Sequence, residues 1–468
     1  MIYIEKDIKT PIYMQIYQQI KRDILSGDTE KGTILPGSRF LAKELGIGRN
    51  TINNAYSQLA VEGYIESKKG IGFVVLDVLE DSASFDTKYI SKKPEEYLDS
   101  LTIKKYDYDF NFGNFPDNLF PASAWRRYIN QILFSDEMKT INHYQDKQGD
   151  LDLRRELKKF LKQNRGVNCN EEQIIIGCGL HYMLELICKL ISIQNKKIAF
   201  EEPGYHGSRR VFLNNGFTLE LINILENGLD IEALQKTDAG AVYVTPSHQF
   251  PLGTVLSLQN RKQLISWAAN NKAYIIEDDY DSEFRYNSKP IPSLQSIDYD
   301  DCVIYIGTFS KSFSPALRVN YMVLPNKLLN EFKELFSSYQ STVSWLTQKI
   351  LYKYIADGKY ERHLRKVRSI YKKRHDTLIQ AINQCMGDKV IIHGRGAGLH
   401  IILEFIGGED QDWLIQKAQE VGVKVYPTKP FWSDQSKYNK NTIFLGYSML
   451  DEKQIIEGIE LLNQAWFK

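Results

Sequence analysis

Short apolar segments recur between residues 173 and 324, and amphipathic helical patterns lie between them. Chains with this alternation fold as α/β layers, because each strand and each helix stripe must bury its apolar side against another element. The predicted strands are Gln173–Ile176, Lys197–Phe200, Ala241–Thr245, Tyr274–Glu277, Val303–Gly307 and Arg318–Leu324. Ligands of such sheets gather where strands end, so we expect the functional site in the loops that follow these segments.

One of these loops carries a lysine among hydroxyl groups. Lys311 lies between Ser310 and Ser312, and Arg318 follows in the same run. A lone loop lysine is by default a solvated surface group, but the neighbouring hydroxyls and guanidinium favour an anionic ligand. The run 307–318 resembles the cofactor-lysine segment of a pyridoxal-phosphate enzyme. That chemistry also needs a phosphate anchor and a carboxylate that keeps the pyridine ring protonated.

Other strand ends supply groups of these kinds. The run 177–179 (Gly-Cys-Gly) precedes a predicted helix, so its backbone N–H groups could hold a phosphate, although such a run is more often only a tight turn. Tyr205 follows the second strand, where its ring could stack on a pyridine or cover the sheet edge. The run 277–279 (Glu-Asp-Asp) ends a buried strand, and acids there are costly unless a cation faces them. A protonated pyridine nitrogen is such a cation.

The first 76 residues carry a different pattern. Isoleucines recur at every fourth position from Ile12 to Ile24, which predicts a helix over residues 12–25. A short helix follows, with Ser38 as its N-cap and Gly46 as its C-cap. A third helix opens at Arg49 and ends before Gly63. Two predicted strands, residues 64–67 and 71–75, are joined by a basic turn, and this order indicates a winged helix-turn-helix.

The third helix has the character of a DNA-recognition helix. Its apolar residues face one side, and short polar side chains near its N-terminus face the other, where they could reach base edges while an arginine holds phosphate. A protein–protein module is the alternative. Residues 1–76 resemble the GntR type of winged helix, which implies a DNA-binding domain. By that resemblance the DNA contacts are Arg39, Arg49, Asn50, Thr51, Asn53, Lys69 and Gly70.

The rest of the composition sets broad limits. Residues 77–107 are hydrophilic and show no sustained period, which predicts a connector between two domains. The five cysteines lack the spacing of a disulfide framework or a zinc site, so we expect no metal. The sequence contains no apolar stretch of about 18 residues, and we expect a soluble, cytoplasmic protein without a membrane partner. The net charge of +1 neither favours nor excludes nucleic acid.

Residues 108–468 resemble the fold-type I pyridoxal-phosphate aminotransferases, with a large and a small domain. The resemblance rests on the loops described above, on the run 144–157 around Tyr144 and Gly149, and on the run 245–253 (TPSHQFPLG). It implies pyridoxal 5′-phosphate as cofactor, joined to Lys311 as an internal aldimine. It also implies pairing of the ring nitrogen with Asp278 and a contact from Tyr280 to the 3-hydroxyl group, with Tyr205 stacked on the ring. The implied phosphate contacts are Gly179, Leu180, His181, Ser310 and Arg318, and Tyr144 for the partner subunit's phosphate.

A GntR-type winged helix before an aminotransferase-like domain is the architecture of the MocR regulators, and the chain resembles them from end to end, including a GABA-responsive member. This implies a head-to-tail, domain-swapped homodimer that binds double-stranded operator DNA and a small amino effector. Aminotransferases hold the substrate carboxylate with an arginine in a C-terminal strand, but the corresponding run 441–447 (NTIFLGY) contains none. Arg209, Lys429 or Arg395 could take that place.

Three functions follow from these patterns. In the first, a transcriptional regulator senses an amino compound or a B6 vitamer through Lys311. In the second, the chain is an active aminotransferase with an auxiliary DNA-binding domain. The missing arginine counts against this function, because a bidentate anchor orients a substrate as well as binding it. In the third, the cofactor site is empty and structural, which Lys311, Asp278 and Arg318 together count against. We expect the first, with at most half-transamination.

Overall fold

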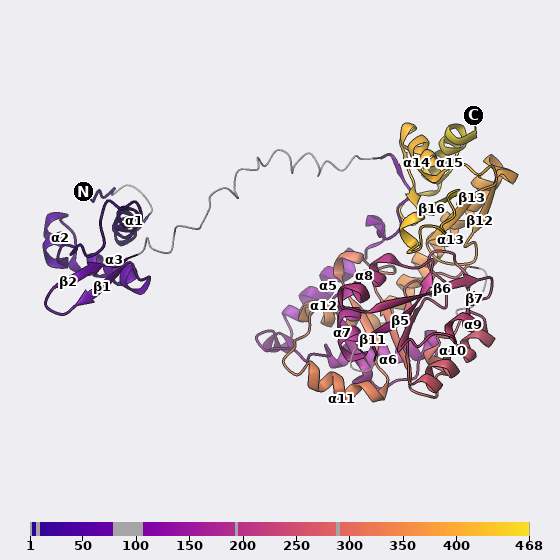
Figure 1. Cartoon of the computed structure of the whole chain (residues 1–468), viewed down its shortest axis with the longest axis horizontal. Coiled ribbons are helices and arrows are strands. Elements are labelled where there is room, and N and C mark those ends of the chain that lie inside the picture. The colour runs from indigo at the N-terminus through magenta and orange to yellow at the C-terminus, as the bar shows by residue number, and fades with distance from the viewer. Residues whose placement is uncertain (1, 6–9, 78–105, 192–194, 287–290, 468) are drawn as a thin grey trace. The chain divides into compact units, whose positions relative to one another are not determined.

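In the computed structural model the chain forms two compact units, Met1–Lys104 and Lys105–Lys468, each described here by itself (Figure 1). The structure describes residues 2–5, 10–77, 106–191, 195–286 and 291–467. The predicted connector, residues 77–107, lies almost wholly outside them. Among the described residues, no helix is long and apolar enough to cross a membrane, and no group of three or more His, Cys, Asp or Glu side chains could hold a metal ion.

The first unit is a winged helix-turn-helix. It contains α1 (Ile12–Leu25), α2 (Ser38–Glu44), α3 (Arg49–Val61) and the antiparallel hairpin of β1 (Ile65–Lys68) and β2 (Gly72–Val75). The isoleucine stripe of α1 packs on the apolar side of α3 in a shared core, and each fully buried side chain of this size contributes about 1.5–3 kcal/mol. The fold prediction is confirmed.

The predicted cap of α2 is wrong by one position. Gly37 is the N-cap, and Ser38 is the first helical residue. Gly48 likewise caps α3, and neither cap supplies a side-chain hydrogen bond. The hydroxyl of Ser38 instead accepts a hydrogen bond from Arg49 Nε at 3.4 Å, which links the starts of the two helices.

The second unit is built on a mostly parallel sheet. Its strand order is β4-β11-β10-β9-β8-β5-β6-β7, with β11 antiparallel to both of its neighbours and β7 antiparallel to β6. The strands are β4 (Ile174–Gly177), β5 (Lys197–Glu202), β6 (Thr218–Leu225), β7 (Gly228–Leu229), β8 (Ala241–Val244), β9 (Tyr274–Asp279), β10 (Val303–Thr308) and β11 (Asn320–Val323). Parallel strands need crossover connections, and helices fill that role here.

Helices cover both faces of this sheet. The core on one face packs the strands against α7 (Leu180–Ile191), α8 (His206–Asn214) and α11 (Asn326–Leu335). The cores on the other face involve α5 (Ala122–Leu133), α6 (Leu151–Arg165), α9 (Ile231–Leu234), α10 (Leu258–Asn271) and α12 (Trp345–Ala356). Alternate residues of one strand enter opposite cores, as Ile304 and Val303 do in β10, so both faces of the sheet are buried.

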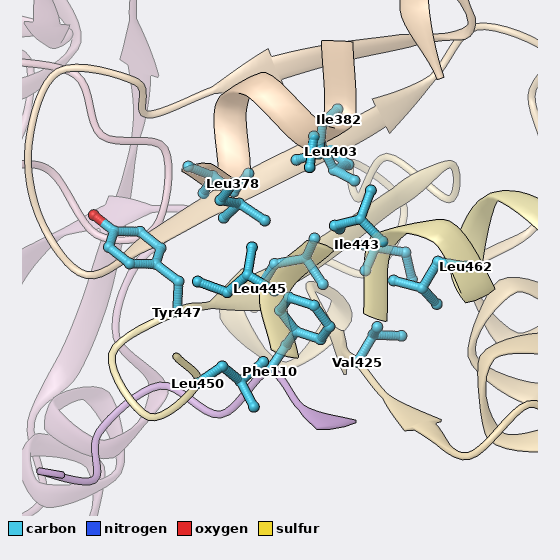
Figure 2. Packing of buried hydrophobic residues seen from close by; sticks show 14 of the residues in the cluster. Phe110, Leu378, Ile382, Leu403, Val425, Ile443, Leu445, Tyr447, Leu450 and Leu462 are labelled. Carbon is cyan, nitrogen blue, oxygen red and sulfur yellow. The ribbon is translucent and has the colours of Figure 1, made fainter. Parts of the chain in front are cut away.

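A smaller antiparallel sheet forms the other end of this unit (Figure 1). Its order is β12-β13-β16-β15. The elements are β12 (Val390–His393), β13 (His400–Phe405), β15 (Tyr426–Pro427) and β16 (Thr442–Gly446), with helices α13 (Lys359–Cys385), α14 (Gln411–Glu420) and α15 (Glu452–Phe467) and the parallel pair β3 (Tyr108–Asp109) and β14 (Val423–Lys424). Figure 2 shows Leu378, Leu403, Ile443, Leu445 and Leu462 from these elements meeting in one core.

Two strand predictions need correction. Arg318 does not begin a strand; it follows the 3-10 turn η8 (Pro315–Leu317) in the left-handed conformation with φ 53°, and β11 begins at Asn320. Strands β6 and β7 were not predicted, although the alternation of polar and apolar residues in β6 is typical of a partly buried strand. The other predicted strands are confirmed, with ends that differ by one or two residues. The α/β class with a winged helix and a fold-type I aminotransferase-like unit is confirmed.

Candidate functional site

A cavity of about 180 Å³ lies at the carboxyl ends of strands β5, β8, β9 and β10. Its lining residues are Phe112, Leu180, His181, Tyr205, Thr245, Phe250, Asp278, Tyr280, Thr308, Ser310, Lys311, Arg318 and Asn320. The structure therefore brings together the cofactor-site residues predicted from separate loops, except Gly179, which adjoins the cavity, and Tyr144.

Lys311 presents a buried amine to this cavity. Its Nζ lies 4.0 Å from the centre of the Phe112 ring. Burial disfavours the charged ammonium and lowers the pKa of Lys311 to about 8, while the carboxylates of Asp281 and Asp278 oppose that shift. An appreciable share of this amine is consequently unprotonated near pH 8, which is the condition a nucleophilic lysine needs.

Asp278 faces the cavity from the end of β9. Burial, assisted by the charges of Asp279 and Asp281, raises the pKa of Asp278 to about 7, whereas a hydrogen bond from Tyr243 and the charge of Lys311 act in the other direction. Tyr243 donates its hydroxyl proton to Asp278 and accepts a hydrogen bond of 2.9 Å from Ser208. The carboxyl is thus held in position by a neutral phenol, and a cation placed beside it would favour its ionised form.

The opposite side of the cavity is suited to an anion. Helix α7 starts at Leu180, directly after Gly179, so free backbone N–H groups and the positive end of the helix dipole point there. Gly179 has φ +89°, and a Cβ atom at this position would lie 2.2 Å from a guanidinium nitrogen of Arg318. Glycine is required for the arginine to reach this place. The left-handed turn at Arg318 brings its side chain back toward α7.

A polar atom in the wall is left without a partner. Asn320 is 3% exposed, and its Oδ1 accepts no hydrogen bond from any described residue. Buried amide oxygens are normally paired. Because Asn320 lines the cavity, its free oxygen indicates that the site is shaped for a ligand.

One side of the cavity is aromatic. Tyr205, Phe250 and Tyr280 line it. The hydroxyl of Tyr280 lies 3.1 Å from Nδ1 of His248, which is also 2.8 Å from the carboxylate of Asp281. Tyr280 is therefore fixed by a buried chain of polar contacts, and Tyr205 packs edge-on to Phe250 at 5.7 Å.

Four predicted residues lie away from the cavity. Tyr144 is 91% exposed and does not line it. Arg209 forms a buried ion pair of 2.8 Å with Glu202 and donates a hydrogen bond of 2.7 Å to the carbonyl of Gly204. Lys429 and Arg395 are exposed and do not line the cavity either.

Sequence reasoning missed two residues that line the cavity, Phe112 and Asn320, and one residue that contacts the cavity residue Asp278, namely Tyr243. Phe112 comes from the segment between β3 and α5, far from the strand-end loops, and carried no motif. Tyr243 lies inside β8, where an aromatic residue is ordinary core, so only its contact with Asp278 reveals its position. Asn320 was within a predicted strand. Only the structure shows where these three residues lie relative to the cavity.

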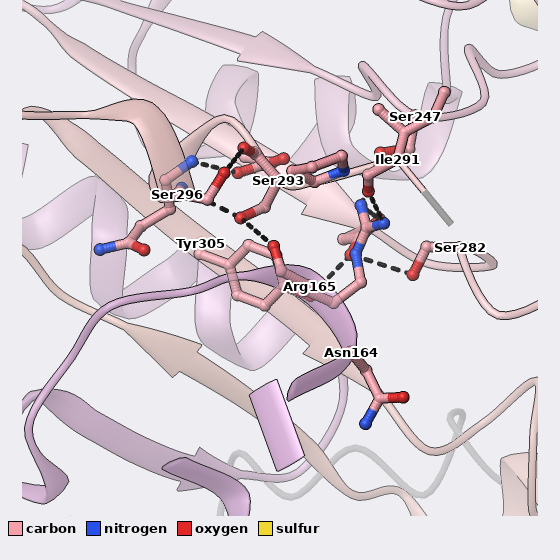
Figure 3. A network of polar contacts seen from close by, with 12 residues as sticks. Asn164, Arg165, Ser247, Ser282, Ile291, Ser293, Ser296 and Tyr305 are labelled. Carbon is pink, nitrogen blue, oxygen red and sulfur yellow. Dashed lines mark hydrogen bonds and ion pairs between the residues drawn. The ribbon is translucent and has the colours of Figure 1, made fainter. Parts of the chain in front are cut away.

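A second polar network holds the end of β9 (Figure 3). Arg165, at the last turn of α6, pairs with Asp279 at 2.7 Å, and both side chains are at most 4% exposed. Asp279 also accepts hydrogen bonds from Tyr305 at 2.6 Å and Ser282 at 3.0 Å, and Arg165 donates to Ser247 at 2.7 Å. The network joins the end of β9, which carries Asp278, to the loops after β8 and β9, and Tyr280 reaches the cavity from the second of these loops.

In the first unit the residues predicted to contact DNA lie in the second and third helices and in the wing. Arg39 is in α2; Asn50, Thr51 and Asn53 follow Arg49 in the first turns of α3; Lys69 and Gly70 form the turn between β1 and β2. All are exposed or partly exposed, whereas Ile52, Ala55, Tyr56 and Leu59 of α3 are buried. The predicted division of α3 into an inner and an outer side is confirmed.

Comparison with known proteins identifies the family. The model of the family "Aminotransferase class I and II" matches residues 107–437, and that of "Bacterial regulatory proteins, gntR family" matches residues 12–75. The uncharacterized HTH-type transcriptional regulator YdeL of Bacillus subtilis is 37% identical over 470 residues, which cover 99% of this chain and 98% of YdeL. The probable rhizopine catabolism regulatory protein MocR of Rhizobium meliloti is 29% identical, covering 100% and 96%.

The chain belongs to the MocR-type transcriptional regulators. The second unit of this regulator also matches solved enzymes. The α-aminoadipate aminotransferase LysN of Thermus thermophilus, solved with N-(5′-phosphopyridoxyl)-L-leucine, superposes with a TM-score of 0.68 at 25% identity and covers 76% of this chain and 91% of LysN. Aminotransferases of class I and II depend on pyridoxal phosphate, and GntR-type domains bind operator DNA.

Proposed function

We propose that this regulator holds pyridoxal 5′-phosphate in the cavity around Lys311. In this proposal, occupation of the site by an amino compound or a B6 vitamer changes the affinity of the winged helix for operator DNA. Residues 1–76 serve as the DNA-binding domain, residues 77–107 as the connector and residues 108–468 as the effector domain. The observation that carries the proposal is the convergence of a buried lysine amine, a buried carboxyl and an anion-binding helix start on one cavity.

The residues present fit this cofactor. Arg318, Ser310 and the first turn of α7 at Leu180 and His181 would hold the phosphate. The unpaired Oδ1 of Asn320 would accept a hydrogen bond from a donor group on the ligand. Asp278 would pair with the protonated ring nitrogen, because its buried carboxyl has a neutral phenol as its neighbour and gains from a cation. Tyr205 would stack on the ring and Tyr280 would contact its 3-hydroxyl group.

When bound, the cofactor supplies an aldehyde that combines reversibly with amines. The chain's own contribution is to leave an appreciable share of the Lys311 amine without its proton near pH 8 and to hold a proton on the ring nitrogen through Asp278. The aromatic wall excludes water from the amine. Because an incoming amine and Lys311 compete for the same position, ligand binding changes what Lys311 contacts, and this difference can shift an equilibrium between two domain arrangements.

The residues that would contact the partner subunit and the operator DNA are exposed or partly exposed in this chain. Tyr144, at 91% exposure, would contact the phosphate in the partner subunit of a head-to-tail, domain-swapped homodimer. Arg49 and the polar side of α3 would enter the major groove, with Lys69 and Gly70 of the wing against the backbone. Arg39 would hold phosphate beside them.

Operator binding tests this function. Full-length protein is used to select fragments from a random-sequence duplex library, and the affinity for the selected site is measured by fluorescence anisotropy with and without cofactor. We expect sequence-selective binding, a loss of about 1–3 kcal/mol in Asn53→Ala and little change in Gln58→Ala, whose amide donates to Glu62 at the C-terminal cap of α3. Absence of any selected sequence in both cofactor states would contradict the proposal.

A further inference from the structure

We propose that the effector of this regulator is a primary amine that carries no carboxylate, with an alkyl or aromatic body that lies against the aromatic wall of the cavity. The inference rests on the proposed function and names the ligand class of the same site. It departs from the amino-acid ligands of the aminotransferase fold, and it is carried by the positions of the cations and aromatic rings around the cavity.

The wall of the cavity that faces the small sheet is aromatic over two layers. Phe112 and Phe250 line the cavity, with ring centres 5.6 Å apart. Behind them, Phe431 lies 4.9 Å from Phe250, and Phe444 lies 5.5 Å from Phe112. These rings form one buried cluster. Such a wall favours an apolar body or a cationic group over an anion, because ring faces carry negative potential.

The strand that could supply a carboxylate anchor has no place for one. Phe444 occupies the middle of β16 and packs into the aromatic cluster. At Gly446 a Cβ atom would lie 2.3 Å from the carbonyl oxygen of Asn111, so no side chain can be accommodated there. This end of the cavity is closed by apolar surface and backbone.

Arg209 is the arginine nearest in sequence to Tyr205, and it is not available to a ligand. Its guanidinium is bound to Glu202 at 2.8 Å, to the carbonyl of Gly204 at 2.7 Å, and also to Phe431 and Ser433. Glu202 in turn accepts backbone hydrogen bonds from Ser433 and Asp434. Arg209 therefore fixes the loop that carries Phe431, and freeing it would leave a buried carboxylate unpaired.

The remaining cations of the cavity serve the cofactor. Among the described residues that line it, the lysine and arginine side chains are Lys311 and Arg318, both on the cofactor side, and His181 is in the first turn of α7. His206, the next residue after Tyr205, is kept neutral, because burial and the charge of Arg209 lower its pKa. A carboxylate on the effector would thus enter a site to which the described residues of this chain supply no further cation, beside Asp278.

Matched ligand pairs test this inference. Full-length protein loaded with pyridoxal phosphate is titrated with 2-phenylethylamine or phenylalanine, and with butylamine or 4-aminobutyrate, while the cofactor absorbance and the affinity for a selected operator are recorded. We expect each amine to act at a concentration at least about tenfold below that of its matched amino acid, since a buried unpaired charge costs more than one factor of ten. Equal or tighter response to either amino acid would overturn the inference.

A variant pair checks the role of the wall. Phe250→Leu is expected to weaken 2-phenylethylamine about tenfold and butylamine less, because only the aromatic ligand loses a ring contact. Phe134→Leu, at a position 90% exposed and outside the cavity, is the control and should change neither. Cofactor absorbance and operator binding that respond to no amine would refute the inference and leave the cofactor assignment intact, whereas absence of cofactor absorbance would refute both.

Discussion

At the scale of single residues, the site depends on side chains whose charge state burial has changed. Lys311 has a pKa of about 8 and Asp278 one of about 7, each moved toward the neutral form mainly by desolvation. The positions of Lys311, Asp278 and Arg318 were predicted from the order of the loops and their resemblance to those of aminotransferases. The ion pair of Arg209 with Glu202 was not predicted, because a sequence does not show which charged group a buried arginine will contact.

The low pKa of Lys311 predicts a pH profile. In cofactor-free protein, the rate of pyridoxal phosphate uptake should rise with pH, reach half of its maximum near pH 8 and level off at higher pH, since only the unprotonated amine reacts. Asp281 raises the pKa of Lys311, so Asp281→Asn should move the midpoint to lower pH. Stopped-flow absorbance measures both, with Glu420→Gln on α14 as control. A midpoint near the ordinary lysine value, or an upward shift in Asp281→Asn, would refute this account.

Gly179→Ala should damage the phosphate side of the cavity. The added methyl group displaces the Arg318 guanidinium, and loss of one charge-assisted hydrogen bond, about 1.5–3 kcal/mol, weakens cofactor binding roughly 10- to 100-fold. Gly422→Ala is the matched control, because Gly422 has a similar φ of +77° with no atom within 4 Å. Equilibrium dialysis of cofactor against both variants makes the comparison, and equal affinities would show that Arg318 does not hold the phosphate.

At the scale of elements, the large sheet and the helix-turn-helix were predicted from the spacing of apolar residues and from the glycines that end helices. Strand β6 was missed although its alternating, partly buried residues are typical of a strand toward the edge of a sheet. The start of β11 was misplaced because the left-handed turn at Arg318 is set by the fold around it. The ion pair of Arg165 with Asp279 joins residues 114 positions apart, and no local pattern reveals such a pair.

That ion pair should be important for the stability of the second unit. Arg165→Leu leaves Asp279 buried without its cation, and we expect the free energy of unfolding of this unit to fall by about 3–5 kcal/mol. Arg155→Ala, on the same helix but with a side chain 53% exposed, should cost less than about 1 kcal/mol. Urea unfolding followed by tryptophan fluorescence compares the two. Similar losses in both variants would show that burial of the pair is unimportant.

At the scale of the whole molecule, one chain contains a GntR-type DNA-binding unit and an aminotransferase-like unit. If an amine changes operator affinity through the second unit, thermodynamic linkage requires the operator to change amine affinity by the same factor. Titration of the amine with and without saturating operator should therefore give the factor found in the reverse experiment. Unequal factors at equilibrium would mean that the amine acts somewhere other than this protein–DNA complex.

The central claim is that Lys311 is the residue that holds the cofactor. Reduction of the native full-length protein with borohydride after incubation with pyridoxal phosphate, followed by peptide mass mapping, tests it directly. The account predicts a phosphopyridoxyl group on the peptide that contains Lys311, and its loss in Lys311→Ala. An unmodified Lys311, or a label found mainly on other lysines, would contradict it.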